Sequence, residues 1–329
     1  MKNSRVLVFI PVLAIILCGC ILVALAQSPH QPPPYWAFAI DPNSGSSTPT
    51  KEDTTPKRVP GSHASYTLAE IDDMFRVPDW YPEEHPAMPE IVAHGRKPDV
   101  YACGYCHLPN GLGRPENASI AGLAAGYIAR QLDDFKTGVR KSSEPRHLPA
   151  AVMAKIGSRA SDAEVKAAAQ YFSQLKRKPW IRVVETATVP KTHVAGWMLV
   201  ASTPVGTEPI GERVIEMPEN LERTELRDDT SGFVAYVPVG SLQRGKMLVT
   251  TGDGGKTTAC AKCHGPGLRG AGNIPSIAGR SPSYVVRQMF DIQSGARAGV
   301  LSRTMKPMVE KLSMDDMVAI AAYLASLRP

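Results

Sequence analysis

The sequence predicts a mainly α protein in which two similar helical domains are joined by an extended, partly β connector and preceded by an N-terminal signal or membrane helix. Three observations predict this architecture. The chain of 329 residues is about twice the usual domain length, two of its stretches are related by an internal repeat, and both carry apolar residues at helical spacing. Aromatic residues make up only 6% of the chain, which is few for two packed cores, so we expect a non-protein group to fill part of them.

Residues 1–26 have the pattern of an export signal or a membrane anchor. Lys2 and Arg5 precede an uncharged, mostly apolar run. The run has 21 residues, about 31 Å as a helix, and this length matches a bilayer core of roughly 30 Å and favours a retained anchor. Ala24-Leu25-Ala26 is a credible cleavage site and Cys20 a candidate for lipidation, so these alternatives stay open. In each case the remaining chain is exported.

Residues 27–90 are predicted to form a tether and a lead-in to the first helical domain. Eight Pro, four Ser and four Thr fall within residues 27–60, so nearly half of these positions resist regular structure. The aromatic patch at residues 34–38 either lies at a membrane interface, docks onto a partner or folds back on the protein's own surface.

An internal repeat organises the remainder of the chain. A shift of 157 residues aligns 103–140 with 260–297 without a gap, and the 15 identities in 38 positions exceed what chance gives. A shift of 152 aligns a second block, in which Ser161 matches Ser313. Ser161 precedes an acidic first turn, as a helix N-cap does.

The repeat defines two helical domains and a segment between them. We name residues 91–179 the first repeat, residues 238–329 the second repeat and residues 180–237 the connector. Short β-prone runs, separated by Gly and Pro, lie in the connector at residues 181–184, 197–200 and 233–237. We therefore expect an extended connector with a few strands, and we assign it no chemistry.

Each repeat contains the sequence Cys-x-x-Cys-His. This spacing is typical of covalent c-type haem attachment, in which two sulfurs form thioethers with the porphyrin and the histidine becomes the proximal iron ligand. A zinc site pairs two Cys-x-x-Cys units at short separation, whereas these lie 157 residues apart. A thioredoxin-like pair gives no role to the adjacent histidine. The predicted residues for two covalently bound haem c groups are Cys103, Cys106 and His107 in the first repeat and Cys260, Cys263 and His264 in the second.

The second axial ligand is assigned by comparing the repeats. Methionine opposite histidine is an electron-transfer arrangement that raises the reduction potential. The second repeat offers Met305, Met308 and Met314. Only Met305 aligns with a methionine of the first repeat, Met153, at the shift of 152. His147 is the rival ligand in the first repeat, but as a lone histidine in a Pro-rich loop it is expected on the surface.

These motifs resemble the tandem di-haem class I cytochromes c, and most of all the cytochrome c4 type. In that family the haem motif is followed by a Pro-x-Ile/Leu-Ala-Gly loop and a Tyr-x-x-x-Gln-Leu helix, and the ligand methionine lies seven residues before a Leu-Ser-Asp helix start. Residues 275–279 match the loop, Tyr284 begins the helix motif, and Met305 has the family spacing. Met153 has the same spacing. Ala118 replaces the proline whose carbonyl orients the proximal histidine in the family.

The resemblance implies an electron-transfer protein rather than an enzyme, and no catalytic residue is assigned. With the export signal, it implies a location in the bacterial periplasm, tethered to the inner membrane if the N-terminal helix is retained. The expected partners are redox proteins: a donor dehydrogenase or quinol-oxidising complex, and an acceptor oxidase or cytochrome of a respiratory chain. A haem subunit of a larger dehydrogenase or oxidase complex is the alternative, and a di-haem peroxidase is a weaker one because it needs an iron open on one side.

The charge is distributed unevenly along the chain. Each repeat has a net charge of +7, whereas residues 27–90 have −6 and the connector has −4. No cluster of Lys and Arg interleaved with aromatic residues is present, so we expect no nucleic-acid partner. Two basic repeats favour docking onto acidic partner surfaces.

The two motifs predict the haem content directly. The denatured protein should retain two covalent haems per chain after extraction with acidified acetone, and the variant Cys260→Ala with Cys263→Ala should retain one. Pyridine haemochrome spectra measure both quantities. Recovery of a single haem from the wild-type chain would contradict the prediction.

Overall fold

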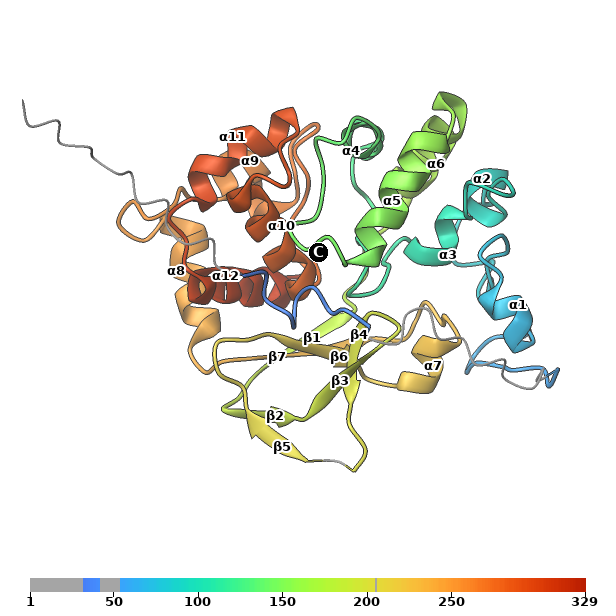
Figure 1. Ribbon diagram of the computed structural model, residues 1–329, viewed down its shortest axis with the longest axis horizontal. Helices are drawn as coiled ribbons and strands as arrows, with labels where there is room; N and C mark the ends of the chain where they lie inside the picture. The colour runs from blue at the N-terminus through green and yellow to red at the C-terminus, as the bar shows by residue number, and fades with distance from the viewer. Residues whose placement is uncertain (1–31, 42–53, 205) are drawn as a thin grey trace, which may run out of the picture. The chain divides into compact units, whose positions relative to one another are not determined.

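A computed structural model describes residues 32–41, 54–204 and 206–329 (Figure 1). The chain divides into two units, Met1–Pro32 and Pro33–Pro329, and all of the described helices and strands lie in the second. The predicted signal or membrane helix at residues 1–26 falls outside the described residues. Within the described ranges, no helix is both long enough and apolar enough to cross a bilayer.

Helices form both repeats, and the strands of the described residues all lie in the connector (Figure 1). The α-helices are α1 (Leu68–Asp72), α2 (Glu90–Ala93), α3 (Cys103–His107), α4 (Ala125–Lys136), α5 (Leu148–Arg159), α6 (Asp162–Gln174), α7 (Leu221–Glu225), α8 (Ser241–Thr251), α9 (Ala261–His264), α10 (Pro282–Ser294), α11 (Val300–Val309) and α12 (Met314–Ser326). A 3-10 helix, η1, spans Pro266–Leu268. The strands are β1 (Ile181–Glu185), β2 (Thr188–Pro190), β3 (Thr192–Ala195), β4 (Met198–Ala201), β5 (Thr207–Pro209), β6 (Ile215–Pro218) and β7 (Phe233–Val237).

The start of the last helix in each repeat is fixed by a capping box. The Ser161 hydroxyl accepts a hydrogen bond from the backbone N–H of Glu164, whose carboxylate accepts one from the backbone N–H of Ser161. Ser313 and Asp316 make the same pair of bonds at the start of α12. Both backbone N–H groups of each pair are satisfied in this way, and the N-cap predicted at Ser161 is confirmed.

The first and last helices of the second repeat cross at very short range. Gly245 in α8 is buried against α12, and a Cβ at this position would overlap the carbonyl oxygen of Ala319. Only a residue without a side chain permits this approach. The crossing brings the apolar face of α8, with the buried Leu248 and Val249, onto the almost wholly buried α12.

The connector is folded, which corrects the prediction that it is extended. Its first strand, β1, pairs in parallel with its last, β7, and β6 completes a three-stranded sheet in the order β1-β7-β6 (Figure 1). Two antiparallel pairs, β2 with β5 and β3 with β4, lie between them in the chain. The three predicted strand runs correspond to β1, β4 and β7. Because β1 and β7 run in parallel, the connector enters this strand pair beside Phe233 and leaves it beside Glu185, so its two ends lie at opposite ends of the pair.

Residues 33–41, which we name the N-terminal strap, are packed into the protein. Trp36, Ala37 and Phe38 are at most 4% exposed and belong to one apolar core with the connector and the second repeat. The Arg287 guanidinium donates to the Ala37 carbonyl, and the Asp41 carboxylate accepts from a connector backbone N–H. Of the three alternatives for the aromatic patch, the structure therefore favours the one in which it folds back on the protein. The first repeat has a separate core beneath α4 and α6.

The crossing of α8 and α12 predicts a stability effect. Gly245→Ala should lower the free energy of unfolding by about 1–3 kcal/mol, because the new methyl group forces two backbones apart. This loss should appear even though alanine is the better helix former. Urea unfolding followed by circular dichroism measures it.

Gly126→Ala is the matched control. Gly126 also lies in a helix, α4, but the atoms nearest to a Cβ there belong to the side chain of Asn273, which is exposed and can move. The control should be neutral or more stable by up to about 1 kcal/mol. Equal destabilisation of both variants would show that close backbone contact is not the cause.

Candidate functional site

Both motif histidines are buried, and a hydrogen bond to a backbone carbonyl fixes the orientation of each ring. His107 ends α3 and His264 ends α9, and each is at most 9% exposed. The Nδ1–H of His107 donates to the carbonyl of Ala118 at 2.8 Å, and that of His264 donates to the carbonyl of Pro275 at 2.7 Å. Burial lowers the pKa of both imidazoles, although the carbonyl bonds oppose this. Each neutral ring therefore keeps Nε2 as its unprotonated nitrogen, which is the ligating form.

The replacement of proline by Ala118 does not alter this contact. Ala118 and Pro275 occupy equivalent places in the two repeats, and each presents its backbone carbonyl to the histidine of its own repeat. The bond uses only the carbonyl, so the proline ring is not needed. The departure from the family pattern in the first repeat thus leaves the histidine orientation unchanged.

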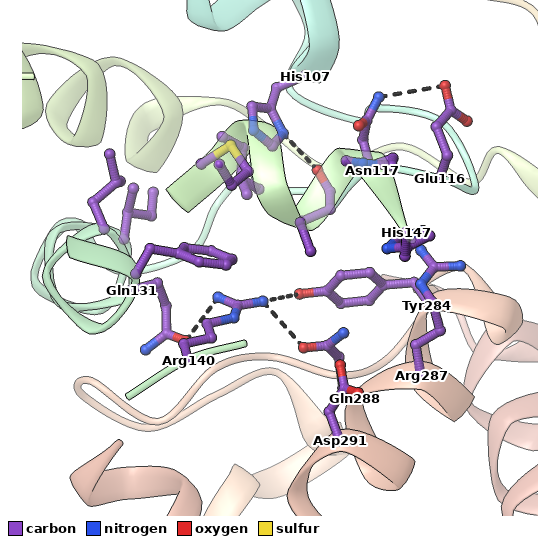
Figure 2. Close-up of a pocket in the computed structure, with 18 of the residues that line it drawn as sticks. His107, Glu116, Asn117, Gln131, Arg140, His147, Tyr284, Arg287, Gln288 and Asp291 are labelled. Atoms are coloured by element: carbon purple, nitrogen blue, oxygen red, sulfur yellow. Dashed lines mark hydrogen bonds between the residues drawn. The ribbon is translucent and has the colours of Figure 1, made fainter. Parts of the chain in front are cut away.

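A cavity beside His107 brings together residues that lie far apart in the sequence (Figure 2). The cavity is partly open to solvent. His107 and Met153 both line it. The apolar part of its wall is formed by Ile120, Leu123, Ile128, Leu132 and Phe135.

The two predicted methionines occupy equivalent positions. Met153 is the sixth residue of α5 and Met305 the sixth residue of α11. Met153 and Cys103 pack against the core of the first repeat, and Met305 and Cys260 pack against the core that contains the second repeat. In each repeat, therefore, the predicted methionine and one motif cysteine pack against a common core.

His147 is buried, which corrects the expectation that it lies on the surface. It is 6% exposed, precedes α5 as its N-cap and lines the same cavity as His107. Its ring packs edge-on against Phe38 of the strap, with centroids 5.7 Å apart. Burial, together with the nearby Arg287 guanidinium, lowers the pKa of His147 to about 3. Its Nε2 has no hydrogen-bond partner within the described part of the chain.

A buried arginine from each repeat reaches into the other repeat. The Arg140 guanidinium donates to Gln131 of its own repeat at 2.8 Å, and to the Tyr284 hydroxyl and the Gln288 amide oxygen of the second repeat at 3.2 and 3.0 Å (Figure 2). The Arg140 and Arg297 backbones also form an antiparallel bridge. The two helical repeats are thus joined by backbone and side-chain bonds.

Arg297 makes the same set of bonds in the opposite direction. Its guanidinium donates to Gln288 of its own repeat at 2.8 Å, and to the Tyr127 hydroxyl and Gln131 of the first repeat at 2.9 and 2.7 Å. The Tyr, Gln and Arg positions are identical in the two repeats at the shift of 157. The internal repeat marks these positions as identical polar residues but gives them no role. The Tyr and Gln lie on α4 and α10, and each Arg follows its helix.

Three buried arginines at this interface are hydrogen-bonded but form no ion pair among the described residues. Arg140, Arg287 and Arg297 are each at most 9% exposed, and the first two line the cavity. None of the three forms an ion pair with a carboxylate in the part of the chain that the structure describes. A buried charge is costly unless it is compensated. Glu116 and Asp291 also line the cavity and are buried, but neither forms an ion pair with these arginines. A partly apolar wall with an imidazole, a thioether and guanidiniums that form no ion pair fits a haem, whose propionates would add further negative charge.

Comparison with known proteins finds relatives among the c-type cytochromes. The model of the family described as cytochrome C oxidase, cbb3-type, subunit III matches residues 248–324. A thiosulfate dehydrogenase electron acceptor of Thiomonas intermedia is 26% identical over 70% of this chain and 80% of its own. Cytochrome c4 of Stutzerimonas stutzeri is 30% identical over 38% of this chain and 66% of its own. Cytochrome c-554(548) of Halomonas halodenitrificans is 35% identical over 22% of this chain and 87% of its own.

The fold, the site and the relatives together show that this is a haem protein that transfers electrons. The chain belongs to the cytochrome c family, as a tandem di-haem member similar to cytochrome c4. It carries two covalently bound haem c groups and transfers electrons rather than catalysing a reaction of its own.

The reciprocal arginine contacts predict energetic coupling between the repeats. In a double-mutant cycle of the haem-loaded protein, Arg140→Leu and Gln288→Leu should show a coupling energy of about 0.5–3 kcal/mol in the free energy of unfolding. Arg182, whose carboxylate partner lies in the connector, provides the control. Arg140→Leu with Arg182→Leu should be additive within about 0.5 kcal/mol. Additivity in the first cycle would contradict a shared network.

Proposed function

We propose that this cytochrome accepts single electrons from a thiosulfate-oxidising dehydrogenase in the bacterial periplasm and relays them through its two haems to an acceptor cytochrome or oxidase. The observation that carries the relay is the reciprocal contact of Arg140 and Arg297, which joins the two repeats through the wall of the first haem cavity. The donor is inferred from relatives in two organisms, both called thiosulfate dehydrogenase electron acceptor, which align with about 70% of this chain.

In this proposal each repeat supplies a complete set of haem ligands. The cysteine sulfurs would form the thioethers with the porphyrin. Nε2 of each motif histidine and the sulfur of one methionine in the same repeat would bind the iron. The carbonyl bonds of the histidines, the shared cavity of His107 with Met153, and the equivalent positions of the two methionines in their helices support this set. The proposed residues are Cys103, Cys106, His107 and Met153 for the first haem and Cys260, Cys263, His264 and Met305 for the second.

The haem supplies one-electron iron chemistry when bound, and the chain controls the conditions for it. The buried carbonyl bond fixes each histidine ring, so the ligand does not reorient between oxidation states. A thioether ligand favours the reduced state of iron and raises the potential. The apolar part of the wall limits contact with water, and the buried guanidiniums would offset the negative charge of the propionates.

A haem subunit of a larger oxidase complex is the second candidate function. The match of residues 248–324 to a subunit of the cbb3-type oxidase favours it. Purification of the native protein under mild conditions separates the two functions, since a subunit would keep a stoichiometric companion and a mobile carrier would not. Attachment to the inner membrane through residues 1–26 is compatible with either function, and we propose it from the sequence pattern alone.

Replacement of the methionines tests the proposed ligands. The oxidised protein should show the weak far-red absorption of methionine-bound ferric haem from both repeats, and Met305→Ala should remove about half of it. Met308→Ala is the matched control, because Met308 lies one helical turn away in the same helix and should leave the band unchanged. The opposite pattern would assign Met308 as the ligand. Rapid binding of carbon monoxide to a reduced wild-type haem would reveal an open iron and contradict a methionine on both.

Reduction by a partner tests the proposed function. Purified thiosulfate dehydrogenase with thiosulfate should reduce both haems, as measured by stopped-flow absorbance, whereas omission of thiosulfate should leave them oxidised. Because both repeats are basic, the rate should fall as ionic strength rises from roughly 0.01 to 0.5 M. No reduction by the enzyme would contradict the proposed donor, and a rate independent of salt would contradict docking through charge.

A further inference from the structure

The two haem-attachment loops differ sharply in exposure. In the first repeat, Gly104 and Tyr105 between the cysteines are buried, and Cys106 is partly buried. In the second repeat, the equivalent Ala261, Lys262 and Cys263 are all exposed. The difference continues downstream, where residues 107–116 are buried except for Asn110, whereas Pro266, Gly267, Arg269 and residues 271–273 are exposed. The haem-attachment loop of the first repeat is therefore mostly buried, whereas the loop of the second repeat is mostly exposed.

The connector covers the loop of the first repeat. The Arg227 guanidinium lies over the Tyr105 ring, 3.5 Å from its centroid, and donates to the Tyr105 carbonyl at 2.9 Å. The Asn110 side chain donates to the Asp229 carbonyl at 2.5 Å. Arg114 donates to the Thr224 carbonyl at 3.3 Å. These contacts come from α7 and the residues that follow it.

The lead-in covers the same loop from another direction. The side chain of Val77 lies against Gly104, where a Cβ would contact it at 3.1 Å, and the Tyr105 hydroxyl reaches the Asp72 carbonyl at 3.4 Å. Trp80, which is 2% exposed, donates its indole N–H to the Leu226 carbonyl and joins the lead-in to the connector. The cover is thus a packed structure made by two segments, rather than a loose loop.

The exposed loop of the second repeat is also basic. Residues 261–273 contain Lys262 and Arg269 and no Asp or Glu. Neither cation forms an ion pair within the described residues. Positive charge on an exposed loop attracts and orients a negatively charged partner surface.

We propose that residues 261–273 are the surface on which an acidic face of a redox partner protein docks, and that the equivalent surface of the first repeat is closed to docking by the connector and the lead-in. This inference rests on the proposed ligand set, in which the sulfur of Cys263 is bonded to the haem. A partner that contacts this loop is separated from the porphyrin by one side chain. Because electron tunnelling weakens steeply with distance, exchange at this loop is faster than through the covered one.

A redox-inert anion locates the docking surface without a partner. Hexacyanochromate(III) is paramagnetic and trianionic, so it broadens the NMR signals of residues near its binding site. In the haem-loaded wild-type protein it should broaden the backbone amides of residues 261–273 and leave residues 104–116 sharp. Equal broadening of both loops, or broadening of the first alone, would overturn the proposal.

Charge reversal then tests the surface with a protein partner. Lys262→Glu with Arg269→Glu should abolish the anion broadening and slow reduction by thiosulfate dehydrogenase about tenfold at low salt. Lys166→Glu with Lys176→Glu is the control, since both lysines are exposed in the first repeat and the change in net charge is the same. The control should leave at least half of the rate. Equal slowing by both pairs would show that net charge alone matters and would overturn the proposal.

The two experiments separate this inference from the proposed donor. If thiosulfate dehydrogenase fails to reduce the wild-type protein, the proposed donor is wrong, and the position of the anion still decides the docking surface. If the enzyme reduces the wild-type protein and the Lys262/Arg269 variant equally fast, the donor stands and the docking surface is wrong. Unchanged haem spectra in both variants establish that the charge reversals have not disturbed the sites.

Discussion

The reciprocal contact of Arg140 and Arg297 is the interaction on which the arrangement of the two haem sites depends. Each arginine follows a helix, is buried, and shares its bonds between a helix of its own repeat and a helix of the other repeat. Buried guanidiniums need hydrogen-bond acceptors, and the tyrosine and glutamine partners supply them. The remaining positive charge is then available for the haem carboxylates. The same few side chains therefore join the two repeats, form part of the cavity wall and carry the positive charge beside it.

The parts of the site that were predictable from the sequence are those whose chemistry lies within a few neighbouring residues. The Cys-x-x-Cys-His motifs, the N-cap at Ser161 and the β-prone runs of the connector all depend on local spacing. The carbonyl bond of His107 did not depend on the residue type at Ala118, because a backbone group makes it. The replacement of the family's proline by Ala118 therefore does not remove the hydrogen bond to the histidine.

The features that were missed depend on contacts between distant parts of the chain. Arg140 meets Tyr284 across 144 residues, and no local pattern indicates the pairing. His147 is buried because Phe38 of the strap packs on it, so its environment is decided by a segment from the other end of the chain. The connector is folded because β1 pairs with β7. Strand propensity located both strands but could not say that they are neighbours. The same fold gives the connector a use, as part of the cover on one haem-attachment loop.

The symmetry of the arginine contacts has a bearing on ancestry. In a two-fold symmetric dimer, residue i of one subunit contacts residue j of the other, and j contacts i in return. Tyr127 with Arg297 and Tyr284 with Arg140 follow this rule inside a single chain. An interface of this kind arises most simply if a single-haem ancestor first associated with itself and its gene was then duplicated and fused. The additions that distinguish the two halves, the connector and the strap, would then be later acquisitions that ended the equivalence of two once identical subunits.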